Sequence, residues 1–170
     1  MIKRTAGFIV IGIILAIILR LFVIEGIYVA SGSMEPTLTV GQQLFLEKLT
    51  LRFRAPRPGE IIVCTSPVDK RKDLIKRVIG LPGDEIAIYK KIIFLNGLPL
   101  NEEYVQHTRA SERLKGDTLE PVRVPPNMVF VAGDNRDESG DSRDWIDPAT
   151  GEKIYFIPFS DIKGRVISLY

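Results

Sequence analysis

The stretch Leu74-Ile75-Lys76-Arg77-Val78-Ile79-Gly80-Leu81-Pro82-Gly83-Asp84 combines an apolar β-strand pattern with a Pro-Gly turn. Two adjacent cations, Lys76 and Arg77, lie within its apolar part. Neighbouring side chains of a strand point to opposite faces, so these two must point in opposite directions. We therefore expect one of them to face the interior of a β-rich domain.

Short runs of the same kind follow one another from Ile27 onward. Pro and Gly separate them, and the turn dipeptides Pro58-Gly59, Pro82-Gly83 and Asn96-Gly97 lie between runs. The pattern predicts strands over residues 43–47, 60–65, 74–79, 85–89, 92–95, 128–132 and 165–169, and loops over 49–58 and 101–121. Many short strands at close spacing predict a mainly β fold, with one domain built as a barrel or sandwich.

The N-terminal segment has the composition of a membrane anchor. Residues 5–19 carry no charge, and after Arg20 the apolar character continues through Ile24. A helix over residues 5–24 would be about 30 Å long, which matches one hydrocarbon core. Arg20 lies near the far end, where its guanidinium can reach the interface. A cleaved secretory signal and a buried core helix are the alternatives, and the signal lacks small residues at a cleavage site.

The flanking charges predict how this anchor is oriented. Lys3 and Arg4 precede the apolar segment, so the positive-inside rule predicts a cytoplasmic N-terminus. We expect residues 1–25 to form a cytoplasmic tip and a transmembrane anchor, and residues 26–170 to form one extracytoplasmic β-rich domain. The expected location is the cell (inner) membrane, crossed once, with the lipid bilayer as a partner.

The composition excludes several classes of function. The 170 residues carry a formal net charge of only +2 and no long basic run, which argues against nucleic acid as a partner. The single cysteine, Cys64, cannot form an internal disulfide, and its apolar surroundings are typical of a buried strand residue. No Cys and His residues have the spacing of zinc ligands, and we expect neither a metal nor another cofactor.

A candidate nucleophile follows the apolar segment, in Ser31-Gly32-Ser33-Met34-Glu35-Pro36-Thr37-Leu38. A serine needs a base, and the only histidine, His107, lies in a polar stretch without a motif. Lysine can replace histidine where burial lowers its pKa from about 10.4 toward neutrality. Ser33 and Lys76 together suggest a Ser–Lys hydrolase at a membrane surface, although each alone is more often part of a plain turn or a surface strand.

A third polar stretch, Gly133-Asp134-Asn135-Arg136-Asp137-Glu138-Ser139-Gly140-Asp141-Ser142-Arg143-Asp144-Trp145, follows a predicted strand. A calcium loop is the rival interpretation, but the acids miss the spacing of an EF-hand and no glutamate closes the loop. The density of hydrogen-bonding groups instead indicates an internally paired network that braces a site.

Taken together, these stretches resemble the type I signal peptidases, the membrane-bound Ser–Lys proteases that remove leader peptides. The resemblance runs from the anchor to near the C-terminus, and it implies a β-rich domain of coiled antiparallel sheets. Its markers are Ser31-Gly32-Ser33-Met34-x-Pro36-Thr37-Leu38, Gly59-Glu60-Ile61-Ile62-Val63, Lys76-Arg77-Val78-Ile79-Gly80-Leu81-Pro82-Gly83-Asp84 and Gly133-Asp134-Asn135-Arg136-Asp137-x-Ser139-x-Asp141-Ser142-Arg143.

The resemblance implies a role for each motif residue. Ser33 is the expected nucleophile and Lys76 the general base. Ser31 Oγ and the backbone N–H of Ser33 would form the oxyanion hole. Supporting roles fall on Ser139, which would orient the lysine amine, and on the ion pairs Asp141–Arg143 and Asp134–Arg77.

The expected substrate follows from the same resemblance. An extended segment of an exported preprotein would pair with strand edges near residues 27–31 and 73–75. Alternate side chains would enter shallow pockets that select small residues at −1 and −3. The residues expected to line these pockets are Val29, Met34, Leu38 and Ile75.

The chain also departs from the family pattern. Ala30 stands where members often have proline, residues 146–153 form an added turn, and the accessory region of some members is absent or reduced to residues 101–121. Several alternatives stay open: a specialised or catalytically inactive, membrane-tethered peptide-binding homologue, and an organelle inner-membrane processing protease. A self-cleaving Ser–Lys protease of the repressor type would need a DNA-binding N-terminus, which the apolar segment does not fit.

Overall fold

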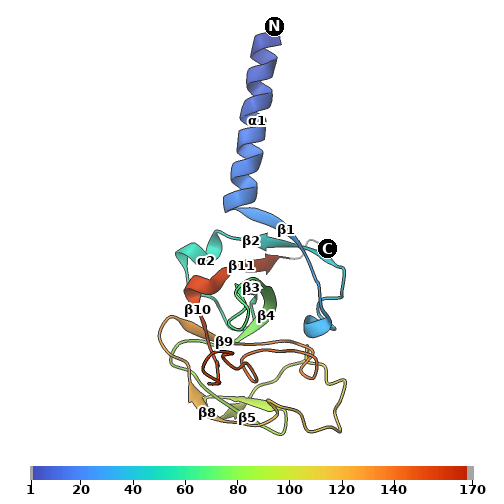
Figure 1. The fold of residues 1–170 in the computed structure, drawn as a ribbon, viewed down its shortest axis with the longest axis vertical. Helices are drawn as coiled ribbons and strands as arrows, with labels where there is room; N and C mark the ends of the chain where they lie inside the picture. The colour runs from blue at the N-terminus through green and yellow to red at the C-terminus, as the bar shows by residue number, and fades with distance from the viewer. Residues whose placement is uncertain (1, 168–170) are drawn as a thin grey trace.

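A long N-terminal helix projects from a β-rich body in the computed structural model, which describes residues 2–167 (Figure 1). The helix, α1, covers Ile2–Phe22. Its large apolar side chains from Phe8 to Phe22 are between 44% and 74% exposed. No helix in the described part of the chain meets the length and hydropathy required to cross a membrane. The predicted transmembrane anchor therefore stays a prediction.

Seven strands form the larger sheet, in the order β1-β2-β11-β3-β4-β9-β10, and every neighbouring pair is antiparallel. Their alternating or continuous apolar residues are typical of strands buried on one or both faces. The strands are β1 (Ile24–Tyr28), β2 (Gln43–Glu47), β3 (Ile61–Thr65), β4 (Asp73–Gly80), β9 (Met128–Ala132), β10 (Ile157–Pro158) and β11 (Ile162–Ile167).

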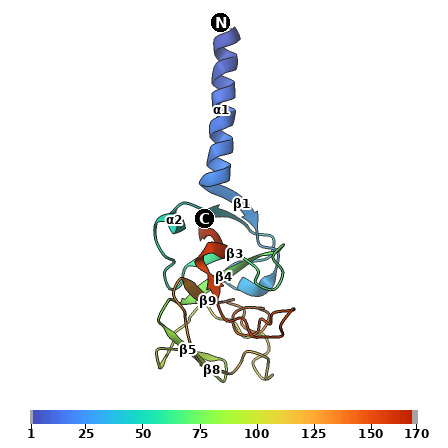
Figure 2. The ribbon, with the colours of Figure 1, turned by 60° about the vertical axis from the view of Figure 1, so that its left-hand side comes forward.

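A smaller sheet in the order β7-β6-β5-β8 lies at the end of the molecule farthest from α1 (Figures 1 and 2). Its hairpin turns have the positive φ angles of tight two-residue turns, at Lys90 and Lys91 and at Asn96 and Gly97. The strands are β5 (Glu85–Tyr89), β6 (Ile92–Leu95), β7 (Leu98–Pro99) and β8 (Leu119–Arg123). The short elements η1 (Gly32–Met34), α2 (Thr50–Phe53) and η2 (Phe159–Asp161) complete the fold.

Strand β4 joins the two sheets through the turn at Pro82-Gly83. Gly83 has a φ of 92°, and the Asp84 carboxylate accepts a hydrogen bond from the Leu81 N–H at 2.9 Å. Gly80 ends β4 with no room for a Cβ, since that atom would lie 2.7 Å from Ile86 Cδ1. The sheets therefore pack closely at this corner.

Three buried apolar clusters stabilise this arrangement. One lies around Ile62 and Val78 in the large sheet, and a second joins Phe130 to Ile86 of the small sheet. The third, with Val29, Met34, Leu38 and Leu44, lies beneath the segment that follows β1. Ser33 lies in this segment, so the third cluster fixes the backbone around it.

The mainly β fold predicted from the sequence is confirmed, and the strands over 43–47, 85–89, 92–95 and 128–132 have the predicted bounds. Two predictions were wrong in detail. Residues 21–24 do not all continue the helix, because β1 begins at Ile24 and pairs with β2. The last strand begins at Ile162 rather than residue 165, and residues 168 and 169 of the predicted strand lie outside the described part.

Short elements were missed where local signals are weak. The predicted loop 49–58 contains α2, and the end of the predicted loop 101–121 enters β8. β10 has only two residues and one of them is proline, so its sequence shows no alternation of apolar and polar residues that would predict a strand. Such elements depend on contacts with distant strands rather than on local propensity.

Candidate functional site

The Ser33 hydroxyl and the Lys76 amine lie together, although 43 positions separate them in the chain. Ser33 belongs to η1, just after β1, and is 8% exposed. Lys76 belongs to the middle of β4 and is 2% exposed. The distance from Lys76 Nζ to Ser33 Oγ is 2.9 Å. This distance allows direct proton transfer between a serine and a lysine.

Burial changes the chemistry of Lys76. Desolvation lowers the pKa of the Lys76 amine below its ordinary value, and the Asp141 carboxylate opposes part of that shift. A lower pKa increases the fraction of neutral amine near pH 7, and a neutral amine can accept a hydroxyl proton. The arrangement therefore has the geometry and the electrostatics of an activated serine.

Ser31 also contacts the Ser33 hydroxyl. Its Oγ donates toward Ser33 Oγ over 3.4 Å, and Ser31 itself has an extended backbone immediately before η1. The backbone N–H of Ser33 has no acceptor within residues 2–167. A hydroxyl and a free N–H beside a nucleophile are the kind of donors that can stabilise an oxyanion.

Asp141 is the centre of the loop that follows β9. Its carboxylate accepts hydrogen bonds from Ser139 Oγ at 2.6 Å and from the Gly133 N–H at 2.8 Å. Arg143 adds two further bonds, from Nε at 2.7 Å and from Nη2 at 2.9 Å. Burial alone would raise the pKa of Asp141, but Arg143 holds it below the usual value. The carboxylate is thus ionised and fully paired.

No hydrogen bond joins Ser139 to Lys76 in the described part of the chain, and the Ser139 hydroxyl donates to Asp141. Its role in orienting the amine stays a prediction. Ser139 nevertheless lies beside Gly133, whose other neighbour is the Ser33 carbonyl. The loop and the nucleophile segment therefore meet at Gly133.

Gly133→Ala is expected to disorganise the site without straining the backbone. A Cβ at position 133 would collide with the Ser33 carbonyl oxygen and with Ser139 Oγ, neither of which can move freely. Overpacking of this kind costs about 1–3 kcal/mol of stability. We expect a loss of about 100-fold in kcat/KM, since small displacements of a catalytic group have effects of that order. Gly140→Ala, where the nearest atom is 3.9 Å away, is the matched control and should retain activity.

Asn135 was missed by the sequence analysis as an individual residue. Its side-chain Nδ2 donates to the Gly32 carbonyl at 3.2 Å, and its backbone N–H donates to the Ser33 carbonyl at 3.1 Å. Its Oδ1 is buried and has no hydrogen-bond partner within the described residues. Its place in the block 133–143 marked the region, but nothing in the sequence distinguished it from its neighbours.

Arg77 points away from Lys76, as the alternation along a strand requires. Its guanidinium makes a two-point ion pair with Asp134, with distances of 2.8 and 2.6 Å, and Thr37 also donates to Asp134. The Tyr104 ring stacks against the guanidinium at 3.9 Å. The predicted pair Asp134–Arg77 thus links β4, the loop after β9 and the residues that follow Ser33.

A small cavity of about 70 Å³ adjoins the dyad. Val29, Met34 and Ile75 line it, together with Ser33 and Lys76. Leu38 does not line the cavity and instead packs behind Val29 and Met34. The volume corresponds to little more than two water molecules at about 30 Å³ each, so it suits a small side chain.

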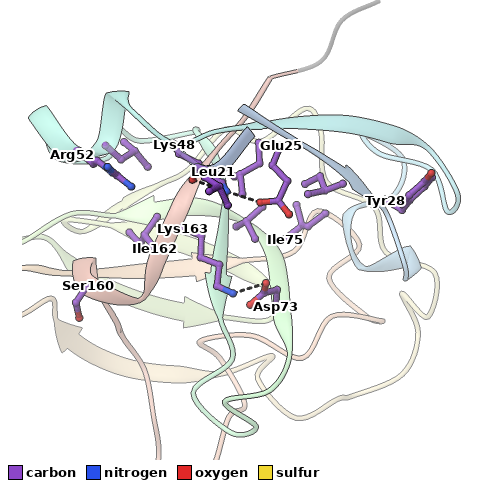
Figure 3. A pocket seen from close by; sticks show the side chains of 14 residues that line it. Leu21, Glu25, Tyr28, Lys48, Arg52, Asp73, Ile75, Ser160, Ile162 and Lys163 are labelled. Carbon is purple, nitrogen blue, oxygen red and sulfur yellow. Dashed lines mark hydrogen bonds and ion pairs between the residues drawn. The ribbon is translucent and has the colours of Figure 1, made fainter. Parts of the chain in front are cut away.

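A larger groove of about 740 Å³ is lined by residues that include Leu21 at the end of α1, Lys48 after β2 and Ile75 of β4 (Figure 3). Two ion pairs cross it, Glu25–Lys48 at 2.6 Å and Asp73–Lys163 at 2.7 Å. Lys48 also lies 3.4 Å from the Leu21 carbonyl at the end of the helix. The groove and the cavity share Tyr28, Asp73 and Ile75, so they adjoin each other at these residues.

Two other reactive side chains take no part in the site. Cys64 is buried in β3, and burial raises the pKa of its thiol to about 12. His107 lies 3.4 Å from the carboxylate of Asp137, which lies next to Lys91. His107 makes no contact with Ser33 among the described interactions.

Comparisons with known proteins show the family to which the chain belongs. Residues 2–170 match the family described as "Signal peptidase, peptidase S26". The chain is 42% identical over 159 residues to "Probable signal peptidase I-2" of Synechocystis sp., covering 90% of this chain and 66% of that relative. It is 35% identical to "Signal peptidase I P" of Bacillus subtilis subsp. natto, covering 91% of this chain and 88% of the relative. A crystal structure of a signal peptidase I from Enterococcus faecalis superposes with a TM-score of 0.51 at 29% identity, covering 67% of this chain and 98% of that one.

Proposed function

The chain belongs to the signal peptidase family, peptidase S26, and on that premise we propose that it is a membrane-bound serine endopeptidase with a Ser33–Lys76 dyad. Its proposed reaction is the removal of N-terminal signal peptides from exported preproteins. The observation that carries this proposal is the distance of 2.9 Å between Lys76 Nζ and Ser33 Oγ, at a lysine that is 2% exposed. A surface lysine could not keep the neutral amine that the reaction needs.

The proposed reaction begins with the neutral Lys76 amine. Lys76 Nζ takes the hydroxyl proton as Ser33 Oγ attacks the carbonyl carbon of the scissile bond. Ser31 Oγ and the Ser33 N–H stabilise the oxyanion, and a donor of this kind contributes about 3–4 kcal/mol to lowering the barrier. The protonated Lys76 then gives its proton to the leaving nitrogen. Water hydrolyses the acyl-enzyme, with Lys76 acting again as base.

We propose that the substrate binds as an extended strand between β1 and β4. β1 pairs only with β2, and residues 73–76 of β4 pair only with β3, because pairing with β9 begins at Arg77. Both strands thus have a free edge within the described part of the chain, and the cavity near Ser33 lies between these edges. A peptide in this position would place one side chain in the small cavity, and alternate side chains would follow along the groove.

We further propose that α1 holds the enzyme at a lipid bilayer. Its exposed apolar side chains from Phe8 to Phe22 would be unfavourable in water, and lipid would cover them. Lys3 and Arg4 favour an orientation with the N-terminus on the cytoplasmic side and the β-rich domain on the outer side. The groove begins at Leu21 near the end of α1 and adjoins the cavity that Ser33 lines, which suits a substrate that leaves the membrane next to the helix.

A substrate series tests this proposal. Detergent-solubilised enzyme would be mixed with preproteins that carry Ala, Ser or Leu at −1, and mass spectrometry would map the new N-terminus. Cleavage is expected after Ala or Ser, whereas Leu should lower kcat/KM by about 100-fold, because a cavity of this size cannot hold it. Leu at −2, which points away from the cavity on an extended chain, is the control. Equal cleavage after Leu at −1 would contradict the proposed pocket.

A further inference from the structure

We propose that Asn135 is a positioning residue that aims the Ser33 N–H at the oxyanion, a role that rests on the proposed function of Ser33. Asn135 Nδ2 donates to the Gly32 carbonyl at 3.2 Å. The Glu35 N–H donates to the same carbonyl at 3.1 Å, so this oxygen is held from two directions. The Asn135 backbone N–H holds the next carbonyl, that of Ser33, at 3.1 Å.

The geometry of one peptide unit links these contacts to the oxyanion. The Gly32 carbonyl and the Ser33 N–H belong to the same trans peptide, in which the two groups point to opposite sides. A donor that fixes the carbonyl on one side therefore fixes the direction of the N–H on the other side. The Ser33 N–H has no acceptor within residues 2–167, as expected for a group kept free for the substrate.

The neighbouring residues show why Asn135 can reach this position. Gly133 lets the loop after β9 approach the Ser33 carbonyl, since a side chain at position 133 would collide with it. The side chain of Arg136 is fixed by an ion pair with Glu102 at 2.6 Å. Asn135 is thus held between two anchored residues, and its own exposed fraction is 3%.

The side-chain amide of Asn135 is oriented with Nδ2 toward the Gly32 carbonyl. With the opposite orientation, Oδ1 would face the Gly32 carbonyl, and two acceptors would repel each other, so the hydrogen-bond network assigns Nδ2 to that side. Oδ1 is left buried without a hydrogen-bond partner among residues 2–167.

Asn135→Leu removes the donor while keeping a similar side-chain volume. The lost hydrogen bond is offset by the loss of an unpaired buried oxygen, so the melting temperature should change by no more than a few degrees. The N–H of residue 135 remains, and only the Gly32 carbonyl is released. We expect kcat/KM for preprotein cleavage to fall by about 10- to 100-fold, less than the loss of a whole oxyanion donor, because the N–H is still present.

A pair of peptides separates positioning from general damage. The probes are a peptide aldehyde that ends in Ala-x-Ala and the same peptide with a terminal carboxylate. Ser33 Oγ adds to the aldehyde carbon, the carbonyl π bond breaks, the hydroxyl proton moves to Lys76 Nζ and the former carbonyl oxygen becomes the oxyanion. Only the aldehyde therefore uses the oxyanion donors fully.

The expected result for Asn135→Leu is a dissociation constant for the aldehyde that rises by the same factor as kcat/KM falls, with the carboxylate unchanged. Asn135→Asp, which presents an oxygen to the Gly32 carbonyl, should lose at least as much. Glu102→Gln disturbs the same loop without touching Gly32, and it should change the two peptides equally or not at all.

Unchanged aldehyde binding by Asn135→Leu would overturn the proposal, and so would an equal loss for both peptides. Ser33→Ala separates this failure from a failure of the nucleophile assignment. If Ser33→Ala reduces aldehyde affinity to that of the carboxylate while Asn135→Leu does not weaken it, only the role of Asn135 is wrong. If Ser33→Ala binds the aldehyde as tightly as the parent, the dyad is wrong and the role of Asn135 falls with it.

Discussion

Ser33→Ala and Lys76→Met are each expected to lower kcat/KM for preprotein cleavage by about 10⁴-fold or more, and the double variant should lose no more than either single one. The two side chains act as a unit, and removal of one member leaves the other without a function. Their contact at 2.9 Å is the physical basis of this coupling. The measurement is steady-state cleavage by detergent-solubilised protein, with the product terminus mapped.

Both variants should remain folded. Because the folded-state pKa of Lys76 lies below its unfolded value, the parent protein carries a desolvation cost at neutral pH, which fades as pH rises toward about 10.4. Lys76→Met lacks this cost and should unfold at no lower temperature than the parent at pH 7. Ser111→Ala and Lys70→Met, at two exposed residues that do not line the cavity beside the dyad, are the matched controls. Substantial cleavage by either dyad variant would favour another nucleophile or base.

Asp141→Asn is expected to destabilise the fold by about 3–5 kcal/mol, which is the usual cost of leaving one member of a buried ion pair alone. Asp141 is fully buried, and the Arg143 side chain is only 6% exposed, so water cannot replace the lost partner. The variant would also weaken the bonds from Ser139 and from the Gly133 N–H. Chemical denaturation at pH 7 measures this loss directly.

Two companion variants make this prediction specific. Asp161→Asn breaks the ion pair with Lys70, whose side chain is 65% exposed, and should cost no more than about 1 kcal/mol. Arg143→Met combined with Asp141→Asn removes both charges and should recover part of the stability. A loss for Asp141→Asn no larger than that for Asp161→Asn would show that the buried pair does not hold the loop together.

Much of the fold could be predicted because the strands carry their own patterns. The run that contains Lys76 is apolar on both sides and ends at Pro82-Gly83, and Asn96-Gly97 supplies the turn between β6 and β7. β1 could not be predicted in this way, because residues 21–24 are as apolar as the helix before them. Only the pairing of Ile24 with Glu47 of β2 ends the helix there.

The candidate site was predictable as a set of motifs but not as a geometry. Ser33, Lys76 and the loop 133–143 lie far apart in the chain, and the contacts that join them depend on the curled large sheet. The alternation of side chains along β4 left open whether Lys76 or Arg77 faces inward. The pairing of Arg77 with Asp134 and the burial of Lys76 decide that question. Asn135 could not be singled out from the sequence, because its proposed role depends on two hydrogen bonds to carbonyls that are distant in the chain.

The pH dependence of kcat/KM for a preprotein with Ala at −3 and −1 shows whether Lys76 is the base, because it reports the ionisation of the base in the free enzyme. We expect kcat/KM to rise with pH as one group deprotonates, at an apparent pKa well below the value of about 10.4 of a free lysine. His107→Gln should leave this rise of kcat/KM with pH unchanged, since His107 lies beside Asp137 and not beside Ser33. Loss of the pH-dependent rise in His107→Gln would contradict a buried Lys76 as the base that activates Ser33. An apparent pKa near 10.4 for the rise would contradict it as well.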